Sequence, residues 1–347
     1  MTADRYAAAI SRGLDAALGR AEPARWDADR DRVAVISDLH RGAGDHADDF
    51  RRAAPTYRRA LEFYLDAGYR LVQLGDAEEL WESWPGRVVA TYRELLELEA
   101  RFSEPGAGGL DKLWGNHDDL WQYPDQVAKH LGPTLGELPV PEALDVEVTA
   151  DGAPLGRLFL VHGHQGTGPS DRWGGISRVV VRWVWRPVQR LLKVTLNTPA
   201  TDFGIRDRHD RAMFEWAAAR GDLVLVAGHT HNPVFTSTAH VGALKQVRDD
   251  LADSEPGSDD ARHARRAVEQ ARDGALAGDG GGGRPGCYFN AGCACFSNGD
   301  VTGIELADGE IRLVRWSAGA AGPGDRVLEA RDLAGVFAAL GTPGGTP

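Results

Sequence analysis

The chain has 347 residues, 42% hydrophobic and 26% charged, with a formal net charge of −12. This composition suits one large α/β domain with insertions, and a second independent domain is not required. The negative charge argues against bulk nucleic-acid binding, which relies on Lys and Arg to neutralise phosphates, but not against a small phosphorylated ligand at a locally positive site.

Residues 1–30 are expected to form an N-terminal helical segment. Asp4 and Arg5 precede an Ala-rich amphipathic stretch, and the apolar region of a secretory signal is missing. We therefore expect a cytoplasmic protein.

Five short apolar runs predict buried strands of a largely parallel or mixed sheet. The runs are Val33–Ile36, Leu71–Leu74, Leu113–Trp114, Leu158–Val161 and Leu223–Val226. In open α/β sheets, ligands bind outside the carboxyl ends of the strands. The side chains that follow these runs are therefore expected to converge on one rim.

Side chains that commonly bind metals follow all five runs. The groups are Asp38-Leu39-His40, Gly75-Asp76, Gly115-Asn116-His117-Asp118, His162-Gly163-His164 and Gly228-His229-Thr230-His231. Taken alone, each group is weak evidence, because an Asp or His after a strand more often caps the loop or forms an ordinary hydrogen bond. The ordered set of five is typical of a two-metal phosphoesterase.

The ligand chemistry suits two borderline divalent ions. Carboxylate, amide and imidazole ligands together accept Mn, Fe, Zn or Co without a thiolate. Asp76 is the expected bridging ligand, because a carboxylate can hold two ions through its two oxygens. Such a centre would attract a phosphate and lower the pKa of bound water from about 15.7 toward about 7, so the expected nucleophile is a metal-bound hydroxide.

These blocks resemble the calcineurin-like metallophosphoesterase superfamily, whose pattern is D-x-H, G-D, G-N-H-D/E, H and G-H-x-H. The resemblance spans about Val33 to Asn232. It implies an α/β fold, an αββα sandwich of two mixed β-sheets flanked by helices, here with a helical cap insertion. It also implies two divalent or mixed-valence metal ions, with manganese expected and iron, zinc, cobalt or nickel as alternatives.

The resemblance assigns two ligand sets that share one aspartate. They are Asp38, His40, Asp76 and His231 for one ion, and Asp76, Asn116, His162 and His229 for the other.

The resemblance also implies a general acid, His117, which would protonate the leaving oxygen, with Asp118 orienting it. Either His162 or His164 could face the metal, and the family pattern favours His162. His164 would then contact the substrate or cap the strand.

Arg41 and His46 follow the first ligand block and are candidate phosphate or substrate contacts. Solvated surface positions would explain both residues equally well.

The stretch Gly75–Trp81 resembles UDP-2,3-diacylglucosamine hydrolases, which cleave a lipid pyrophosphate. Those enzymes usually carry Arg at the position of His117 and His-Gly-Asp in place of His162-Gly163-His164. These departures argue against the lipid A precursor as substrate. The expected substrate is a phosphomonoester, phosphodiester or pyrophosphate in a phosphorylated small molecule or a phospholipid-like molecule.

A helical cap insertion is expected over about residues 166–215. Arg178, Arg182, Arg186 and Arg190 recur every four residues, so on a helix they would form one basic stripe among Trp and Val side chains. The stripe indicates a cap over the site or an interfacial helix that makes peripheral membrane contact. A core-packed helix with solvated arginines is the alternative, and so many charges disfavour a membrane span.

Residues 31–320 are expected to form the metallophosphoesterase domain, with a flexible insertion over about residues 242–286. A C-terminal helix and tail are expected over residues 321–347.

The three cysteines, Cys287, Cys293 and Cys295, are interpreted as small buried hydrophobes, because their spacing matches no trusted metal or redox motif. Their segment is expected to close the second sheet together with Val301–Leu306 and Ile311–Trp316.

Two Asp-Gly pairs predict tight turns. Asp308-Gly309 is expected to form a hairpin, and Asp151-Gly152 a turn before the strand that leads to His162.

A catalytically silent scaffold or membrane-surface protein with the same fold is the second hypothesis. A decayed site should have lost metal ligands, and the sequence retains all the expected ones.

Overall fold

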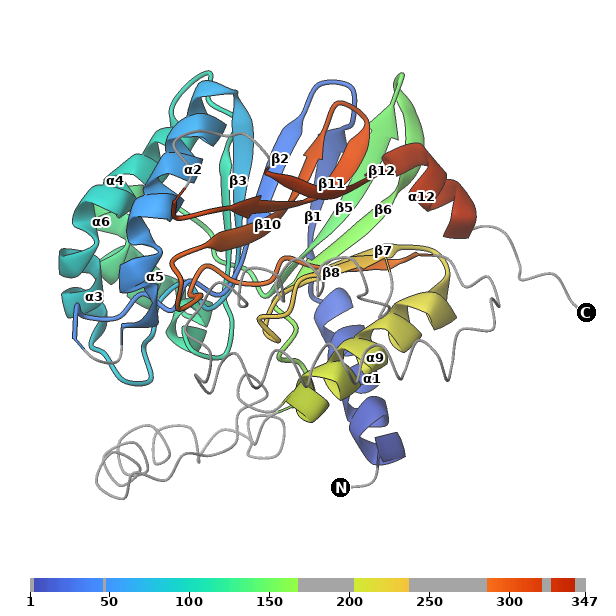
Figure 1. Ribbon diagram of the computed structural model, residues 1–347, viewed down its shortest axis with the longest axis horizontal. Helices are drawn as coiled ribbons and strands as arrows, with labels where there is room; N and C mark the ends of the chain where they lie inside the picture. The colour runs from blue at the N-terminus through green and yellow to red at the C-terminus, as the bar shows by residue number, and fades with distance from the viewer. Residues whose placement is uncertain (1–2, 46–47, 168–202, 237–285, 320–325, 341–347) are drawn as a thin grey trace, which may run out of the picture.

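The computed structural model describes residues 3–45, 48–167, 203–236, 286–319 and 326–340 (Figure 1). Two mixed six-stranded sheets pack against each other, and helices cover both outer faces. The αββα sandwich predicted from the sequence is therefore confirmed.

The first sheet has the strand order β1-β5-β6-β7-β9-β8. Its strands are β1 (Glu22–Asp27), β5 (Ala143–Ala150), β6 (Ala153–Val161), β7 (Val224–Ala227), β8 (Val234–Thr236) and β9 (Tyr288–Asn290). Parallel pairing joins β1 to β5, β6 to β7 and β7 to β9. The other neighbouring strands are antiparallel.

The second sheet has the strand order β12-β11-β10-β2-β3-β4. Its strands are β2 (Arg32–Ile36), β3 (Tyr69–Leu74), β4 (Leu110–Leu113), β10 (Val301–Ala307), β11 (Glu310–Trp316) and β12 (Val327–Asp332). Strands β2, β3 and β4 run parallel, and the others pair antiparallel.

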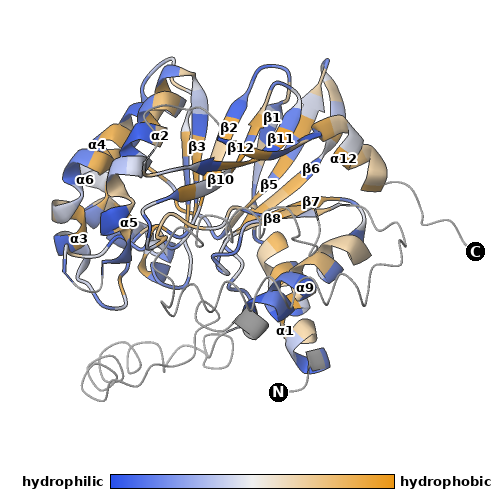
Figure 2. Cartoon of the chain, in the orientation of Figure 1, coloured by the Kyte–Doolittle hydropathy of each residue, from blue (hydrophilic) through white to orange (hydrophobic). Residues whose placement is uncertain are grey.

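The central strands are buried on both faces. In β2, Val33 and Val35 lie in the core between the sheets, whereas Ala34 and Ile36 pack beneath the outer helices. This double burial explains why the sequence shows continuous apolar runs instead of alternation. Figure 2 shows hydrophobic residues concentrated along β6 and β7.

Helices cover the sheets from both sides. α2 (Ala54–Asp66) packs on the second sheet, and α1 (Ala3–Leu18) and α9 (Phe203–Arg220) pack on the first. The shorter helices are α3 (Pro85–Thr91), α4 (Arg93–Ala100), α5 (Pro124–His130), α6 (Gly132–Leu135), α12 (Leu333–Leu340) and the 3-10 helices Asp49–Arg52, Arg101–Ser103 and Asp119–Gln122. None of the described helices has the length and apolar character needed to cross a bilayer.

Two sequence predictions about the fold are wrong. The N-terminal segment is helical only to Leu18, and the edge strand β1 follows it. Strand β9 pairs with β7 and β8 in the first sheet, whereas β10 and β11 belong to the second. The expected common sheet therefore does not form.

Both predicted Asp-Gly turns are confirmed. Asp308 and Gly309 have φ values of 55° and 77° between β10 and β11, and Asp151 and Gly152 have 50° and 74° between β5 and β6. Positive φ at both central residues is the signature of the tight hairpin turn.

Several predictions fall on residues outside the described ranges. They are His46, the arginine stripe of Arg178, Arg182, Arg186 and Arg190, and nearly all of the insertion expected over residues 242–286. The proposed domain boundaries stay predictions.

Candidate metal centre

The predicted metal ligands lie in loops at the carboxyl ends of strands from both sheets. Asp38 and His40 follow β2, Asp76 follows β3, Asn116 follows β4, His162 follows β6, and His229 and His231 follow β7. The loops converge because these strands end at one rim of the sandwich.

The ligand loops have an unusual backbone conformation. Positive φ costs a non-glycine residue about 1–3 kcal/mol and persists only where the surroundings enforce it. Among described non-glycine residues outside this centre, only the hairpin residues Asp151 and Asp308 have it. The predicted ligands that have it are Asp38 (54°), His40 (51°), Asp76 (50°), His229 (70°) and His231 (54°).

Two glycines let backbone approach the carboxylates closely. A Cβ on Gly115 would clash with the carboxylate of Asp76, and one on Gly228 would clash with Ser37 and Asp38. Glycine at these positions therefore allows the loops after β4 and β7 to close around the ligands.

The first ligand set gathers around Asp38. Its Oδ2 accepts a hydrogen bond of 2.8 Å from the backbone N–H of His229. Its Oδ1 lies 3.1 Å from His231 Nε2 and 3.7 Å from His40 Nε2. Ligand atoms of Asp38, His40 and Asp76 lie within 4.8 Å of one another.

The second set gathers around Asp76. Its Oδ1 accepts a 2.8 Å hydrogen bond from the His117 backbone N–H, and its Oδ2 lies 3.1 Å from His162 Nε2. Ligand atoms of Asp76, His162 and His229 lie within 4.8 Å of one another. Because Oδ2 also lies 3.9 Å from His40 Nε2, Asp76 stands between the two sets, as a bridging ligand must.

Four buried ligand atoms form no hydrogen bond among the described residues, although two of them lie 3.1 Å from an atom of opposite charge, Asp38 Oδ1 from His231 Nε2 and His162 Nε2 from Asp76 Oδ2. The four atoms are Asp38 Oδ1, Asn116 Oδ1, His162 Nε2 and His229 Nε2. Buried polar atoms are normally satisfied, so an unsatisfied cluster requires an explanation. Carboxylate, amide and imidazole atoms that are buried without hydrogen bonds form a donor set suited to borderline divalent cations.

The charges of the centre also favour a cation. Burial would raise the pKa of Asp76, but His162 and His117 outweigh it and hold that pKa well below its usual range. Burial would lower the pKa of His162, but Asp76 and Asp38 raise it to about 9. A metal ion would neutralise the two carboxylates without protons on the imidazoles, so metal and protons should compete.

His117 is fixed by contacts on three sides. Its Nδ1 lies 2.6 Å from Glu79 Oε2. Its ring stacks on Trp81, with centroids 4.0 Å apart and planes at 20°, and meets the edge of His40 at 4.6 Å.

Glu79 is a site residue that the sequence prediction missed. Its Oε2 also lies 3.2 Å from His40 Nδ1, so one carboxylate joins a predicted metal ligand to the predicted general acid. Burial would raise the pKa of Glu79, but His117 and His40 lower it to about 2. The sequence feature that could have identified Glu79 is its position three residues after Asp76.

The predicted role of Asp118 is contradicted. Its carboxylate does not contact the His117 side chain; it accepts hydrogen bonds from the backbone N–H groups of Gly115 (2.6 Å) and Ala77 (2.9 Å). Asp118 therefore ties the loop after β3 to the loop after β4, and Glu79 takes the position beside His117.

The three candidate substrate contacts differ in outcome. Arg41 is fully buried 2.7 Å from both Glu78 and Glu99, so its predicted substrate role is wrong. His164 lies beside the second set, with its ring 5.4 Å from that of His162, and its substrate role stays a prediction. His46 lies outside the described residues.

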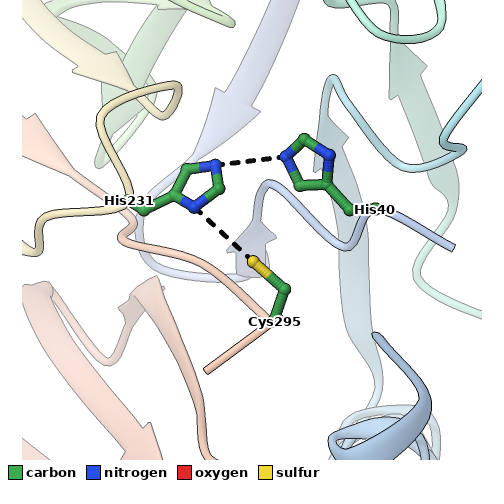
Figure 3. Close-up of side chains that lie close together, drawn as sticks. All are labelled: His40, His231 and Cys295. Atoms are coloured by element: carbon green, nitrogen blue, oxygen red, sulfur yellow. Dashed lines mark hydrogen bonds between the residues drawn. The ribbon is translucent and has the colours of Figure 1, made fainter. Parts of the chain in front are cut away.

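The cysteines do not share one environment. Cys287 and Cys293 are buried, as predicted, but Cys295 is only partly buried and its Sγ lies 3.5 Å from His231 Nδ1 (Figure 3). Ligand atoms of His40, His231 and Cys295 lie within 4.8 Å of one another. The interpretation of Cys295 as a buried hydrophobe is therefore wrong.

The chain was compared with family models, curated proteins and solved structures, and only solved structures match. No family model matches the chain, and no curated protein does. Among solved structures, a conserved uncharacterized protein from Streptococcus pneumoniae TIGR4, described as a predicted phosphoesterase, is 11% identical. That match covers 87% of this chain and 97% of the other with a TM-score of 0.31, which is too low to support an inference.

Two mixed six-stranded sheets flanked by helices, with clustered metal-ligand side chains, agree with the fold expected of metallophosphoesterases.

Proposed function

We propose that the protein is a metal-dependent phosphoesterase of the calcineurin-like superfamily, which hydrolyses a phosphomonoester, phosphodiester or pyrophosphate bond. The observation that carries the proposal is that two groups of ligand atoms, each within 4.8 Å, share Asp76, and that several of these buried atoms form no hydrogen bond. Its substrate would be a phosphorylated small molecule or a phospholipid-like molecule.

Two sets of side chains would hold two ions, with manganese as the proposed metal. The sets are Asp38, His40, Asp76 and His231, and Asp76, Asn116, His162 and His229. Two divalent ions bound there would supply Lewis acidity for water activation and positive charge for the phosphoryl oxygens.

His117 would donate a proton to the leaving oxygen. Because Glu79 contacts Nδ1, the Nε2 atom is left for the substrate. The side chain of His117 is 18% exposed, so it is more accessible than the buried His40 and His162. Its stacking on Trp81 restricts rotation of the ring, which keeps Nε2 in one direction.

Hydrolysis of two chromogenic esters tests the proposal. Chelator-treated protein would be assayed on bis(p-nitrophenyl) phosphate and p-nitrophenyl phosphate, with Mn²⁺ or with chelator. We expect Mn-dependent turnover of at least one ester and none with chelator. Protein that holds two Mn²⁺ ions per chain but hydrolyses neither ester would contradict the proposed reaction on simple esters and would favour a silent scaffold.

A further inference from the structure

The imidazoles of two predicted ligands share one orientation. In His40 and His162, Nε2 faces the carboxylates of the centre. Nδ1 faces outward to an oxygen, Glu79 Oε2 at 3.2 Å for His40 and the Leu74 carbonyl at 3.0 Å for His162. Each ring thus has an inward nitrogen for a metal and an outward nitrogen with an acceptor.

His231 has the same orientation with a sulfur as its outer partner. Its Nε2 lies 3.1 Å from Asp38 Oδ1 and 3.1 Å from His40 Nε2. Its Nδ1, on the other side of the ring, lies 3.5 Å from Cys295 Sγ (Figure 3). Cys295 therefore occupies the position that Glu79 has behind His40.

An imidazole that binds a metal through Nε2 keeps its proton on Nδ1, and that N–H needs an acceptor. Such outer partners fix the tautomer and the direction of the ring. Sulfur is a weak acceptor, so the acceptor behind His231 is the weakest of the three. His231 should therefore be the ligand most sensitive to changes in its outer partner.

The backbone holds Cys295 in this place. The neighbouring Ala294 donates its N–H to the Asp38 carbonyl at 3.1 Å, and Thr302 donates its N–H to the Cys293 carbonyl at 3.0 Å. These bonds join the cysteine segment to the first ligand loop and to β10. The approach of sulfur to His231 thus follows from the chain path.

Cys295 is also the least buried of the three cysteines. All three cysteines lie within the described residues, and Cys287 and Cys293 are buried. Cys293 also lies beside His231, but its 1% exposure shields it from reagents. A small thiol reagent should therefore reach Cys295 before the two buried thiols.

We propose that Cys295 is the positioning residue for His231, and that modification of its thiol weakens metal binding at the centre. The proposal rests on the proposed function, because it requires a metal at His231. Methyl methanethiosulfonate is the probe. The Cys295 sulfur forms a disulfide bond with the methylthio sulfur, methanesulfinate leaves with the electron pair of the broken S–S bond, and the thiol proton passes to solvent.

Mn²⁺ titration of chelator-treated protein by calorimetry tests the positioning role. In Cys295→Ala, we expect one of the two Mn²⁺ sites to bind about 10- to 100-fold more weakly than in wild type. Cys295→Ser should bind like wild type, because a hydroxyl still accepts the Nδ1–H. Cys287→Ala and Cys293→Ala, which remove the two buried thiols, are the matched controls and should also bind normally.

Modification of wild type gives an independent readout. Intact mass should show one methylthio group per chain, and peptide mapping should place it on Cys295. The labelled protein should lose Mn²⁺ affinity as Cys295→Ala does. Dithiothreitol should remove the group and restore the affinity. Cys295→Ser should neither react nor lose affinity. If Cys295→Ala does not fold, the comparison of labelled wild type with Cys295→Ser still tests the positioning role.

Three outcomes would overturn the proposal. Unchanged Mn²⁺ binding in both Cys295→Ala and labelled wild type would show that Cys295 does not position His231. A loss of Mn²⁺ affinity confined to Cys293→Ala would show the same. Wild type that binds no Mn²⁺ would instead refute the proposed metal centre, and this inference with it.

Discussion

A contact of 2.6 Å joins Glu79 Oε2 to His117 Nδ1. The same oxygen lies 3.2 Å from His40 Nδ1, so the orientations of the proposed general acid and of a proposed metal ligand depend on one carboxylate. A change at Glu79 should therefore affect both proton transfer and metal binding.

Glu79→Gln should lower kcat by about 10- to 100-fold, because the amide holds both imidazoles less firmly. Steady-state kinetics at saturating Mn²⁺ would measure the loss, and Mn²⁺ titration would show weaker binding. The exposed Glu94→Gln, which pairs with Arg58 on the surface, is the matched control. Equal kcat values in the two variants would show that Glu79 has no role in turnover.

His117→Gln should affect substrates according to their leaving groups. A p-nitrophenolate leaves without a proton, so its ester should lose little rate, whereas an alkyl phosphodiester should lose about 10²- to 10⁴-fold. The comparison is the slope of log kcat against leaving-group pKa, which should become steeper. His130→Gln, on α5, is the control. An unchanged slope in His117→Gln would exclude the acid role.

Arg41→Met should lower the free energy of unfolding by about 3–5 kcal/mol, because it leaves Glu99 buried without its cation and leaves Glu78 with Lys112 alone. Urea denaturation would measure the change. Arg58→Met, which breaks an exposed pair with Glu94, should cost only about 0–1 kcal/mol. Similar losses in both variants would contradict the buried ion-pair account.

His209 should make the metal-free protein less stable in acid. Burial lowers the pKa of His209 to about 4 from 6.5, although the Gly163 carbonyl accepts from its Nε2 at 2.8 Å and opposes that shift. The unfolded chain takes up this proton below pH 6.5 and the folded chain only near pH 4. The stabilisation is therefore complete above pH 6.5 and is lost as the pH falls.

The difference corresponds to about 3 kcal/mol between the two limits. Urea denaturation with chelator at several pH values would compare wild type with His209→Gln, whose amide can still donate to Gly163. The variant should lose less stability than wild type as the pH falls. Parallel pH profiles of wild type and His209→Gln would show that His209 contributes nothing.

The sequence predicted the strands that carry the ligands because burial on both faces leaves a continuous apolar run. β1 was missed because it is polar and contains Pro23, which only an edge strand accepts. The sheet that β9 joins could not be predicted, because a three-residue strand pairs wherever the tertiary fold brings a partner.

The sequence predicted the metal ligands because each follows a strand, and the carboxyl ends of these strands lie at one rim of the sandwich. Their outer partners could not be predicted in the same way. Glu79 follows Asp76 by three residues, and a glutamate at such a position is usually exposed, so its burial beside two histidines could not be predicted from the sequence. Cys295 reaches His231 through tertiary packing alone, and the burial of Arg41 depends on Glu99, which is 58 residues away in the chain.

The most direct test of the central claim, that Asp76 joins two metal-binding halves, is the Mn²⁺ stoichiometry of wild type and Asp76→Asn. Asp111→Asn is the matched control, because Asp111 pairs with Arg70 on β3, away from the ligand loops. We predict two Mn²⁺ ions per chain in wild type and in the control, and fewer than two in Asp76→Asn, with loss of turnover. Two tightly bound ions and full turnover in Asp76→Asn would contradict the account.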